Sequence, residues 1–212
     1  MLSDKWIILD FDGTMVDSLP LWREVDVDFL SKRGIEVPDD LLGIIEGMNL
    51  WDCAEYFKER FNLEEAEELI IEEWKFLIKE KYEKLPIKED VLHLISEWEK
   101  PLAIASSSEI ELIRSVLRAH HLEERFPSIV TSGEVQASKP EPHVYLEAAR
   151  RLGVNPADCL VFEDTLAGVQ GAKNAGMIAV AVYESMNDKW EQTKEEADFV
   201  LEHFWDWKEV VK

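Results

Sequence analysis

The sequence has few of the features that secreted or membrane proteins need. Among its 212 residues are only two cysteines, Cys53 and Cys159, which lie far apart and form no close-spaced metal-binding pattern. We therefore expect a reduced, cytoplasmic setting rather than a fold held by disulfides. No apolar run approaches the roughly 20 residues that a membrane helix requires. The first five residues do not lead into a long apolar stretch, so we expect no signal peptide.

Basic residues are also scarce. The chain carries 45 acidic residues against 23 basic ones, which gives a formal net charge of -22. A surface of this charge repels nucleic acids and anionic membranes, so we expect neither as a partner. An anionic substrate would need positive charge concentrated at its binding site.

Short apolar runs alternate with segments of helical periodicity along most of the chain. The strands are expected at residues 6–9, 102–105, 129–131, 159–162, 178–182 and 199–201. The helices are expected at residues 90–98, 109–120, 143–152 and 165–175, the last one closed by the cap glycine Gly176. Strictly alternating strands and helices predict an α/β fold, a Rossmann-like parallel sheet with helices on both faces.

A long helical segment separates the first expected strand from the others. Apolar residues recur there at spacings of three and four, as in Leu21, Val25 and Phe29. We therefore predict an α/β catalytic core over 1–15 and 84–212, and an inserted all-helical cap over 16–83 that acts as a substrate-selecting lid. Its hinges are expected near residues 15–17 and 82–86.

Polar side chains follow the expected strands where each one ends. Asp10 and Asp12 follow the first strand, three serines follow the second, and Glu163 and Asp164 follow the fourth. In open parallel sheets, ligands bind at the carboxyl ends of the strands, so we expect these side chains to meet there.

The residue types at this edge fit a metal and a phosphate. Asp10, Asp12, Glu163 and Asp164 supply only oxygen ligands, which favours Mg²⁺ over Zn²⁺. Bound Mg²⁺ and Lys139 would attract a phosphate to this acidic protein. Free backbone N–H groups at Ser107 and Ser108 are expected to cradle its oxygens at the start of the next helix.

Each of these features also has an ordinary structural explanation. An Asp-x-Asp-Gly segment is often only a turn, and Glu163 with Asp164 could be the acidic first turn of a helix. The serines could cap a helix, and Lys139 could lie in an exposed turn before proline. A calcium-binding EF-hand loop is excluded, because its sixth position must be glycine and here it is Met15. The coincidence of all these features at strand ends favours one functional site.

Four stretches resemble the haloacid dehalogenase superfamily of phosphotransferases, in the β-phosphoglucomutase-like subgroup with a helical cap. They are "DFDGTMVDS", "AIASSS", "SKPEPHVY" and "VFEDTLAGVQGAKNAGM". The resemblance implies that Asp10 is a nucleophile that forms an aspartyl-phosphate. It implies that Asp12 protonates the leaving alcohol and then activates water.

The resemblance implies roles for the other residues of the site as well. Ser106 and Lys139 would hold the phosphoryl oxygens, and Gly13 would let the chain turn close to the phosphate. Mg²⁺ would bind Asp10, the backbone carbonyl of Asp12, and Asp164, with Glu163 in or near its coordination shell.

The presence of Asp12 favours hydrolysis of a phosphate ester, because dehalogenases and phosphonate-cleaving members of the superfamily lack this aspartate. We predict a Mg²⁺-dependent phosphatase. The alternatives are a phosphosugar mutase of the β-phosphoglucomutase type and a non-catalytic binding or regulatory relative. The mutase has a histidine where Trp22 stands here, and an arginine near the place of Leu50 or Trp51.

The predicted substrate is a small phosphorylated metabolite such as a sugar phosphate, and the predicted assembly is a monomer. Candidate contacts from the cap are Asn49 and Trp51, with Met48 and Trp22 beside them. For Trp22, packing within the cap is an equally good explanation.

Overall fold

The centre of the molecule is a parallel sheet. The structure is a computed structural model that describes residues 2–45 and 48–211. Its six strands lie in the order β3-β2-β1-β4-β5-β6, and all neighbours are parallel. The strands are β1 (Trp6–Leu9), β2 (Ala103–Ser106), β3 (Ser128–Thr131), β4 (Cys159–Glu163), β5 (Ile178–Val182) and β6 (Phe199–Leu201). The predicted fold class is confirmed.

Helices cover both faces of the sheet, which explains why its strands are apolar without alternation. Ile7 and Leu9 belong to the hydrophobic core on one face, and Ile8 belongs to the core on the other. The first face is covered by α5 (Glu89–Glu97), α6 (Ile110–Ala119) and α10 (Trp207–Val211). The second is covered by α7 (His143–Leu152) and α8 (Leu166–Asn174), and α9 (Trp190–Glu196) packs against α8.

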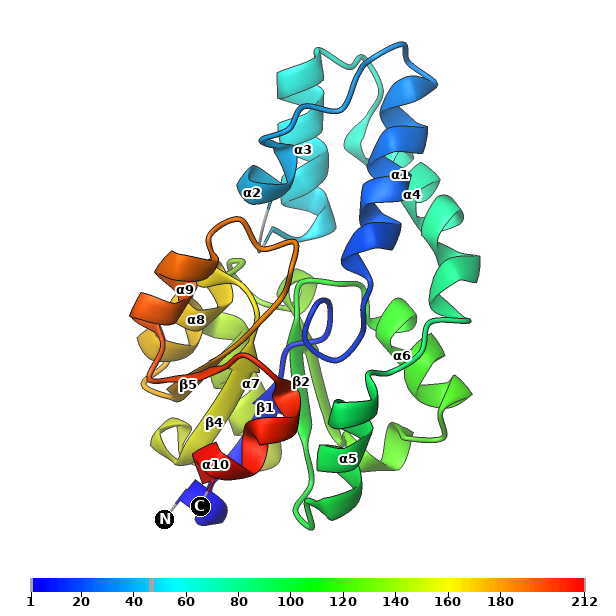
Figure 1. Cartoon of the computed structure of the whole chain (residues 1–212). Coiled ribbons are helices and arrows are strands. Elements are labelled where there is room, and N and C mark those ends of the chain that lie inside the picture. Colours follow the sequence, from blue (N-terminus) through cyan, green and yellow to red (C-terminus); the bar gives the residue numbers. More distant parts are fainter. Residues whose placement is uncertain (1, 46–47, 212) are drawn as a thin grey trace.

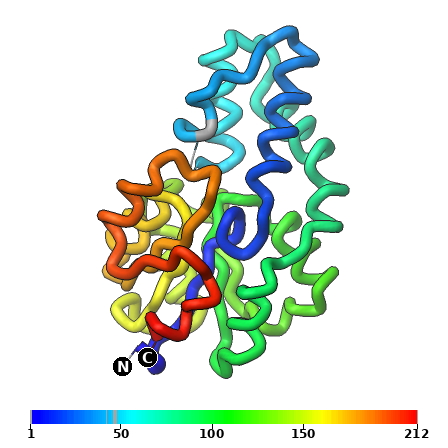
Figure 2. Tube along the Cα trace, in the orientation of Figure 1, coloured from blue at the N-terminus to red at the C-terminus, as the bar shows by residue number. Residues whose placement is uncertain are grey.

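Four helices between β1 and α5 form the cap, which lies above the sheet in Figure 1. They are α1 (Leu19–Ser31), α2 (Leu41–Ile45), α3 (Leu50–Phe61) and α4 (Glu67–Tyr82). The traces of α1 and α4 run side by side (Figure 2), and these helices are in contact. The rings of Phe29, Phe57 and Trp74 join α1, α3 and α4, with centroids 4.9–6.0 Å apart. The predicted helical insertion after the first strand is confirmed.

The two connections between cap and core lie together. Val16 forms one isolated bridge with Asp12 and another with Ile87, and the Lys88 N–H donates to the Met15 carbonyl at 3.0 Å. The incoming and outgoing chains therefore meet beside the end of β1. The domain limits and the hinges at 15–17 and 82–86 stay predictions.

The remaining differences from the predicted elements are small. Helices α9 and α10 were not predicted, nor were five 3-10 turns. The turns are Leu2–Asp4, Glu123–Arg125, Ser132–Glu134, Pro156–Asp158 and Phe204–Asp206. Gly176 has φ +74° and its N–H donates to Lys173, as predicted for the end of α8. Within residues 2–45 and 48–211, no helix is both long and apolar enough to cross a membrane.

Candidate active site

The sheet register brings the polar strand ends to one place. Leu9 pairs with Ile104 on β2 and with Phe162 on β4. The backbone N–H of Asp10 then donates to the Phe162 carbonyl at 3.0 Å, which fixes Asp10 at the end of β1. Asp10 and Glu163 are buried there, at 5% and 0% exposure. The fold therefore brings these strand-end carboxylates together.

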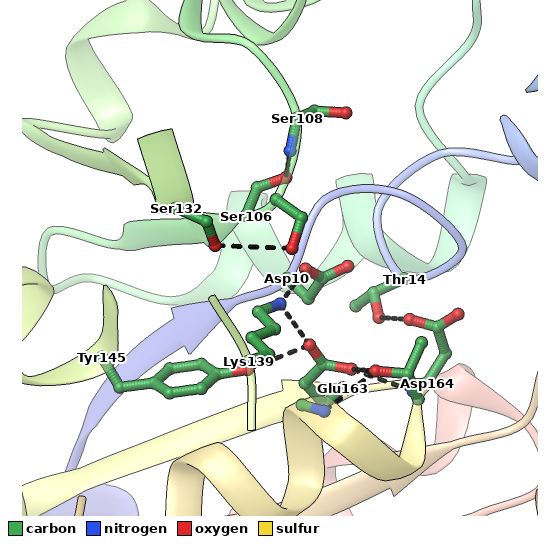
Figure 3. Close-up of polar contacts among 12 residues, drawn as sticks. Asp10, Thr14, Ser106, Ser108, Ser132, Lys139, Tyr145, Glu163 and Asp164 are labelled. Atoms are coloured by element: carbon green, nitrogen blue, oxygen red, sulfur yellow. Dashed lines mark hydrogen bonds and ion pairs between the residues drawn. The ribbon is translucent and has the colours of Figure 1, made fainter. Parts of the chain in front are cut away.

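Lys139 reaches into this group of carboxylates (Figure 3). Its ammonium lies 2.6 Å from Oδ1 of Asp10 and also donates to Oε1 of Glu163. Burial alone would lower the pKa of Lys139. The charges of Asp10 and Glu163 outweigh burial, and the pKa is raised well above its ordinary value. Lys139 is therefore a permanent positive charge inside the site, not an exposed turn residue.

The Glu163 carboxylate is fully hydrogen-bonded. Oε1 also accepts from the Tyr145 hydroxyl at 3.0 Å, and Oε2 accepts from the N–H and the hydroxyl of Thr165, each at 2.9 Å. Gly168 permits this arrangement, because a Cβ there would lie 1.9 Å from the carboxyl carbon of Glu163. Glu163 is thus a rigid support for Lys139.

Only one of the two carboxylate oxygens of Asp164 accepts a hydrogen bond from the described residues. Its Oδ1 accepts from the Thr14 hydroxyl at 3.0 Å, whereas Oδ2 is buried with no hydrogen-bond partner in the described part of the chain. Burial, and next the charge of Glu163, raise the pKa of Asp164 well above its ordinary value. Gly13 has φ +83°, and a Cβ there would lie 2.1 Å from Oδ2. Position 13 therefore needs glycine, both for its positive φ and for the close approach of Asp164.

These carboxylates have the properties of a site for a divalent cation. One oxygen each of Asp10, Glu163 and Asp164 lies within 4.8 Å of the others. Burial raises the pKa of Asp10 well above its ordinary value, so this side chain also needs a positive neighbour to stay ionised. Lys139 can offset the charge of one carboxylate, and a divalent cation would offset the charge of the other two when all three are ionised. The unpartnered Oδ2 of Asp164 and the all-oxygen ligand set fit Mg²⁺.

Asp12 lies outside that acidic cluster. Its Oδ1 accepts from the Ser18 hydroxyl at 2.6 Å and from the Tyr82 hydroxyl at the end of the cap. Burial, and next the charge of Asp12, raise the pKa of Tyr82 well above its ordinary value, so Tyr82 stays a proton donor. The Trp22 indole donates in turn to the Tyr82 oxygen at 2.6 Å. Cap residues therefore set the orientation of this carboxylate.

The serine loop differs from the sequence-based expectation in one respect. The Ser108 N–H is not free, because it donates to the Ser106 hydroxyl oxygen at 3.0 Å. The Ser107 hydroxyl lies 3.4 Å from that of Ser132. Helix α6 begins two residues after Ser108, with Glu109 at its N-cap position, so the serines do not cap it. They line a cavity at the end of β2 instead.

That cavity has a volume of about 170 Å³ and lies between core and cap. Its core wall contains Asp10, Asp12, Ser106, Ser107, Ser108, Lys139, Glu163, Asp164, Thr165, Met186, Asn187 and Asp188. Its cap wall contains Leu19, Trp22, Asp26, Gly43, Ile45, Met48, Leu50, Cys53, Phe57 and Trp74. Trp22 and Met48 thus line the cavity, and their role as substrate contacts stays a prediction.

Asn49 and Trp51 do not line the cavity. The Asn49 side-chain oxygen caps α3 by accepting from the N–H groups of Trp51 and Asp52. Its amide nitrogen donates to the Ser138 hydroxyl at 2.7 Å, next to Lys139, and so joins the cap to the core. The Trp51 side chain is 50% exposed. As substrate contacts, both residues stay predictions.

Several residues of the site were missed in the sequence. Thr14, Ser18, Tyr82, Tyr145 and Thr165 each hold a carboxylate of the site. Most of them stand within the four stretches that resemble the superfamily, but residue type alone does not reveal a partner. Asp26 gave a clearer signal, because a charged residue stands there on the apolar face of a helix, four residues after Trp22.

Known proteins resemble this chain in sequence and in fold. Residues 7–182 match the family model described as haloacid dehalogenase-like hydrolase. Hexitol phosphatase B of Escherichia coli (strain K12) is 32% identical over 193 residues, which cover 85% of each chain. A phosphorylated carbohydrates phosphatase of Thermotoga maritima is 30% identical, covering 86% of this chain and 87% of its own. The crystal structure of a β-phosphoglucomutase from Clostridium difficile superposes with a TM-score of 0.83 at 21% identity, over 95% of this chain and 92% of that one.

Proposed function

This chain belongs to the haloacid dehalogenase-like hydrolases, and we propose that it is a Mg²⁺-dependent phosphatase of small sugar phosphates. The observation that carries the proposal is the buried group of Asp10, Lys139, Glu163 and Asp164, which opens into the cavity beside Asp12. The named activities of the two phosphatase relatives support the substrate class.

Asp10 is the proposed nucleophile. Lys139 holds its Oδ1 at 2.6 Å, so we assign the attack on phosphorus to the other oxygen, Oδ2. The attack would form an aspartyl-phosphate and release the alcohol. The ammonium of Lys139 would stabilise negative charge on the transferring phosphoryl group, and the serines at the end of β2 would bind its other oxygens.

Asp12 is the proposed general acid and base. In the first step it would give a proton to the oxygen of the leaving alcohol, and in the second it would take one from the attacking water. The Ser18 and Tyr82 hydroxyls hold its carboxylate at the border between core and cap. Since Tyr82 and Trp22 belong to the cap, cap closure would orient the proton donor once the substrate is enclosed.

Mg²⁺ would be held by Asp10, by Asp164 and by the backbone carbonyl of Asp12. It supplies positive charge that draws the phosphate into an acidic protein and offsets the charge that develops on it. Glu163, whose two oxygens already accept hydrogen bonds from Lys139, Tyr145 and Thr165, would act next to the ion by orienting Lys139.

The cavity favours a phosphatase over a mutase. A phosphosugar mutase must hold two phosphate groups, one at each end of its substrate. Among the described residues of the cap wall there is no lysine, arginine or histidine, and Leu50 lies near the position where a cap arginine would be needed. A second phosphate would therefore face a wall that offers it no positive charge among the described residues.

The test is phosphate release from a panel of small phosphomonoesters, with Mg²⁺ and with a chelator. The panel includes β-glucose 1-phosphate, glucose 6-phosphate and phenyl phosphate, and the Asp10→Asn variant serves as the blank. We expect release that disappears with the chelator and in the variant. Absence of release from every ester would contradict the proposal, and conversion of β-glucose 1-phosphate to glucose 6-phosphate with a bisphosphate primer would favour the mutase.

A further inference from the structure

Asp26 is a buried acid that the proposed chemistry does not use. It lies on α1, one helical turn after Trp22, and its exposure is 6%. No group of the described chain donates a hydrogen bond to its carboxylate. Among the described residues of the cap wall it is the only charged one, and the same wall includes the aromatic side chains of Phe57 and Trp74.

Such a position is unfavourable for an acid without a ligand. Removing a carboxylate from water without hydrogen bonds is costly, and a buried acid responds by holding its proton more tightly. Burial raises the pKa of Asp26 to about 7, although the nearby charge of Arg23 opposes the effect. A leucine of similar size would pack in this apolar wall without that cost, so an acid at this position indicates a ligand that it binds.

The cavity places Asp26 and the phosphate-binding residues on opposite walls of one space. A phosphomonoester with its phosphate at Asp10 and Lys139 must direct its alcohol portion towards the cap. Aromatic side chains such as Trp22 and Trp74 suit the C–H faces of a sugar, and a carboxylate among them accepts hydrogen bonds from hydroxyl groups.

We propose that Asp26 is a specificity-determining residue that accepts a hydrogen bond from a hydroxyl of the alcohol portion of the substrate. The enzyme thereby selects polyhydroxylated phosphomonoesters over apolar ones. This inference rests on the proposed phosphatase function and adds to it the group that recognises the sugar. An apolar ester leaves the carboxylate buried and unpaired, and is disfavoured for that reason.

The experiment compares Asp26→Leu and Asp26→Asn with wild type on two esters, the best sugar phosphate of the panel and phenyl phosphate. For Asp26→Leu we expect a KM for the sugar phosphate about 10- to 100-fold higher, because a hydrogen bond to a charged group is lost. The KM for phenyl phosphate should be unchanged or lower, and kcat should change little. Asp26→Asn keeps an acceptor oxygen and should retain most of the preference.

The matched control is Asp28→Leu, which removes the same charge from an exposed position on the same helix. It should leave both KM values unchanged. Equal changes for the two esters in Asp26→Leu would overturn the proposal, since they would indicate a general effect on cap packing. A loss confined to glucosamine 6-phosphate, with glucose 6-phosphate unaffected, would also overturn it and indicate recognition of an ammonium group.

A binding measurement separates this proposal from the phosphatase function. Calorimetric titration of glucose 6-phosphate and phenyl phosphate into Mg²⁺-loaded Asp10→Asn protein, with and without Asp26→Leu, needs no turnover. Absence of phosphate release from every ester would refute the phosphatase function alone. Weaker binding of the sugar phosphate in the double variant would still support the role of Asp26, and unchanged binding, or no binding to Asp10→Asn itself, would refute it.

Discussion

The core wall and the cap wall of the cavity differ in how far their buried charges are paired. On the core wall, Lys139 pairs with Asp10 and Glu163, and hydroxyl groups satisfy most of the remaining oxygens. On the cap wall, Asp26 is the only charged residue among those described, and it accepts no hydrogen bond from the described residues. We infer that the paired charges of the core wall serve the phosphate shared by the proposed substrates, and that the unpaired carboxylate of Asp26 is available to the variable alcohol portion.

The core wall is also fixed more firmly in the fold than the cap wall. The core residues stand at the ends of neighbouring strands, whose positions are fixed by backbone hydrogen bonds across the sheet. The cap is a separate group of helices joined to the core by two chain connections beside Val16 and Ile87. We therefore expect changes in the core wall to impair every substrate, and changes in the cap wall to alter the choice among substrates.

The largest effect is expected for Lys139→Met. This change removes the ammonium between Asp10 and Glu163 and leaves buried carboxylates without a counter-charge. We expect kcat to fall about a hundred- to thousandfold for every ester and the free energy of unfolding to fall by about 3–5 kcal/mol. Enzyme assays and urea unfolding would measure both.

Lys79→Met is the control for that variant, since Lys79 is exposed on α4. It should change neither quantity. If Lys139→Met lost activity towards the sugar phosphate but kept it towards phenyl phosphate, the proposed division between the two walls would be wrong.

The next largest effect is expected for Gly13→Ala. The new Cβ would lie 2.1 Å from Oδ2 of Asp164, the oxygen with no partner in the described chain, so Asp164 must move. We expect about a hundredfold lower kcat for all esters and a higher Mg²⁺ concentration for half-maximal activity. A Mg²⁺ titration of phosphate release measures both.

Gly34→Ala is the control that shows whether the effect of Gly13→Ala comes from the contact with Asp164 or from backbone strain. Gly34 has a similar φ of +70°, but nothing lies within 4 Å of the place that a Cβ would occupy there. This variant should lose about 1 kcal/mol of stability and keep its Mg²⁺ dependence. An equal rise in the Mg²⁺ requirement in both variants would show that the contact with Asp164 is irrelevant.

A smaller effect concerns stability, and it comes from the cap wall. The pKa of Asp26 is about 7 in the folded protein, against an ordinary value of 3.8 that describes the unfolded chain. Arg23 opposes this rise, and the Cys53 thiol on α3 interacts with Asp26 as well. Folding therefore favours the protonated acid, and this contribution to stability is complete below about pH 4 and is lost as the pH rises through 7.

Asp26→Asn abolishes that pH dependence. Relative to wild type, the variant should gain up to about 4 kcal/mol of unfolding free energy between about pH 4 and pH 8. Urea unfolding at several pH values measures the difference, and Asp28→Asn is the exposed control on the same helix. A constant difference between wild type and Asp26→Asn across this range would mean that Asp26 is well solvated.

The smallest effect is expected for Ser138→Ala, which breaks a contact between the cap and the core. The Ser138 hydroxyl accepts from Asn49 at 2.7 Å and donates to Asp52, both at the start of α3. Losing these contacts should cost about 1 kcal/mol of cap closure, so KM should rise about fivefold with little change in kcat. The control is Ser31→Ala, which removes an exposed hydroxyl of the cap and should change neither KM nor kcat.

The residues of the core wall could be located from the sequence because each stands next to a recognisable strand. Each strand is a short apolar run, and Asp10, Ser106 and Glu163 each lie at or directly after the end of one. Parallel strands of one sheet must bring such ends together, so the position of these residues followed from their place in the chain. The strand limits agree with the structure to within one or two residues at each end.

The cap wall was predicted less well because a helix can turn any face towards the cavity. Asn49 and Trp51 stay predictions as substrate contacts, since Asn49 caps α3 and Trp51 is half exposed in this structure. Asp26 was overlooked among the many acids of the chain, although it lies on the same face of α1 as Trp22. Its importance depends on which helices pack around it.

The parallel sheet, the helical insertion and the carboxylates at the strand ends can be predicted from residue type and from spacing along the chain. How those charges are compensated depends on contacts that form only in the folded molecule. Asp164 accepts from Thr14, 150 residues away, Asp12 accepts from Tyr82 of the cap, and Asp26 accepts from no group of the described chain. Hydrogen bonds and desolvation act over a few ångströms in space, and distance along the sequence does not report such contacts.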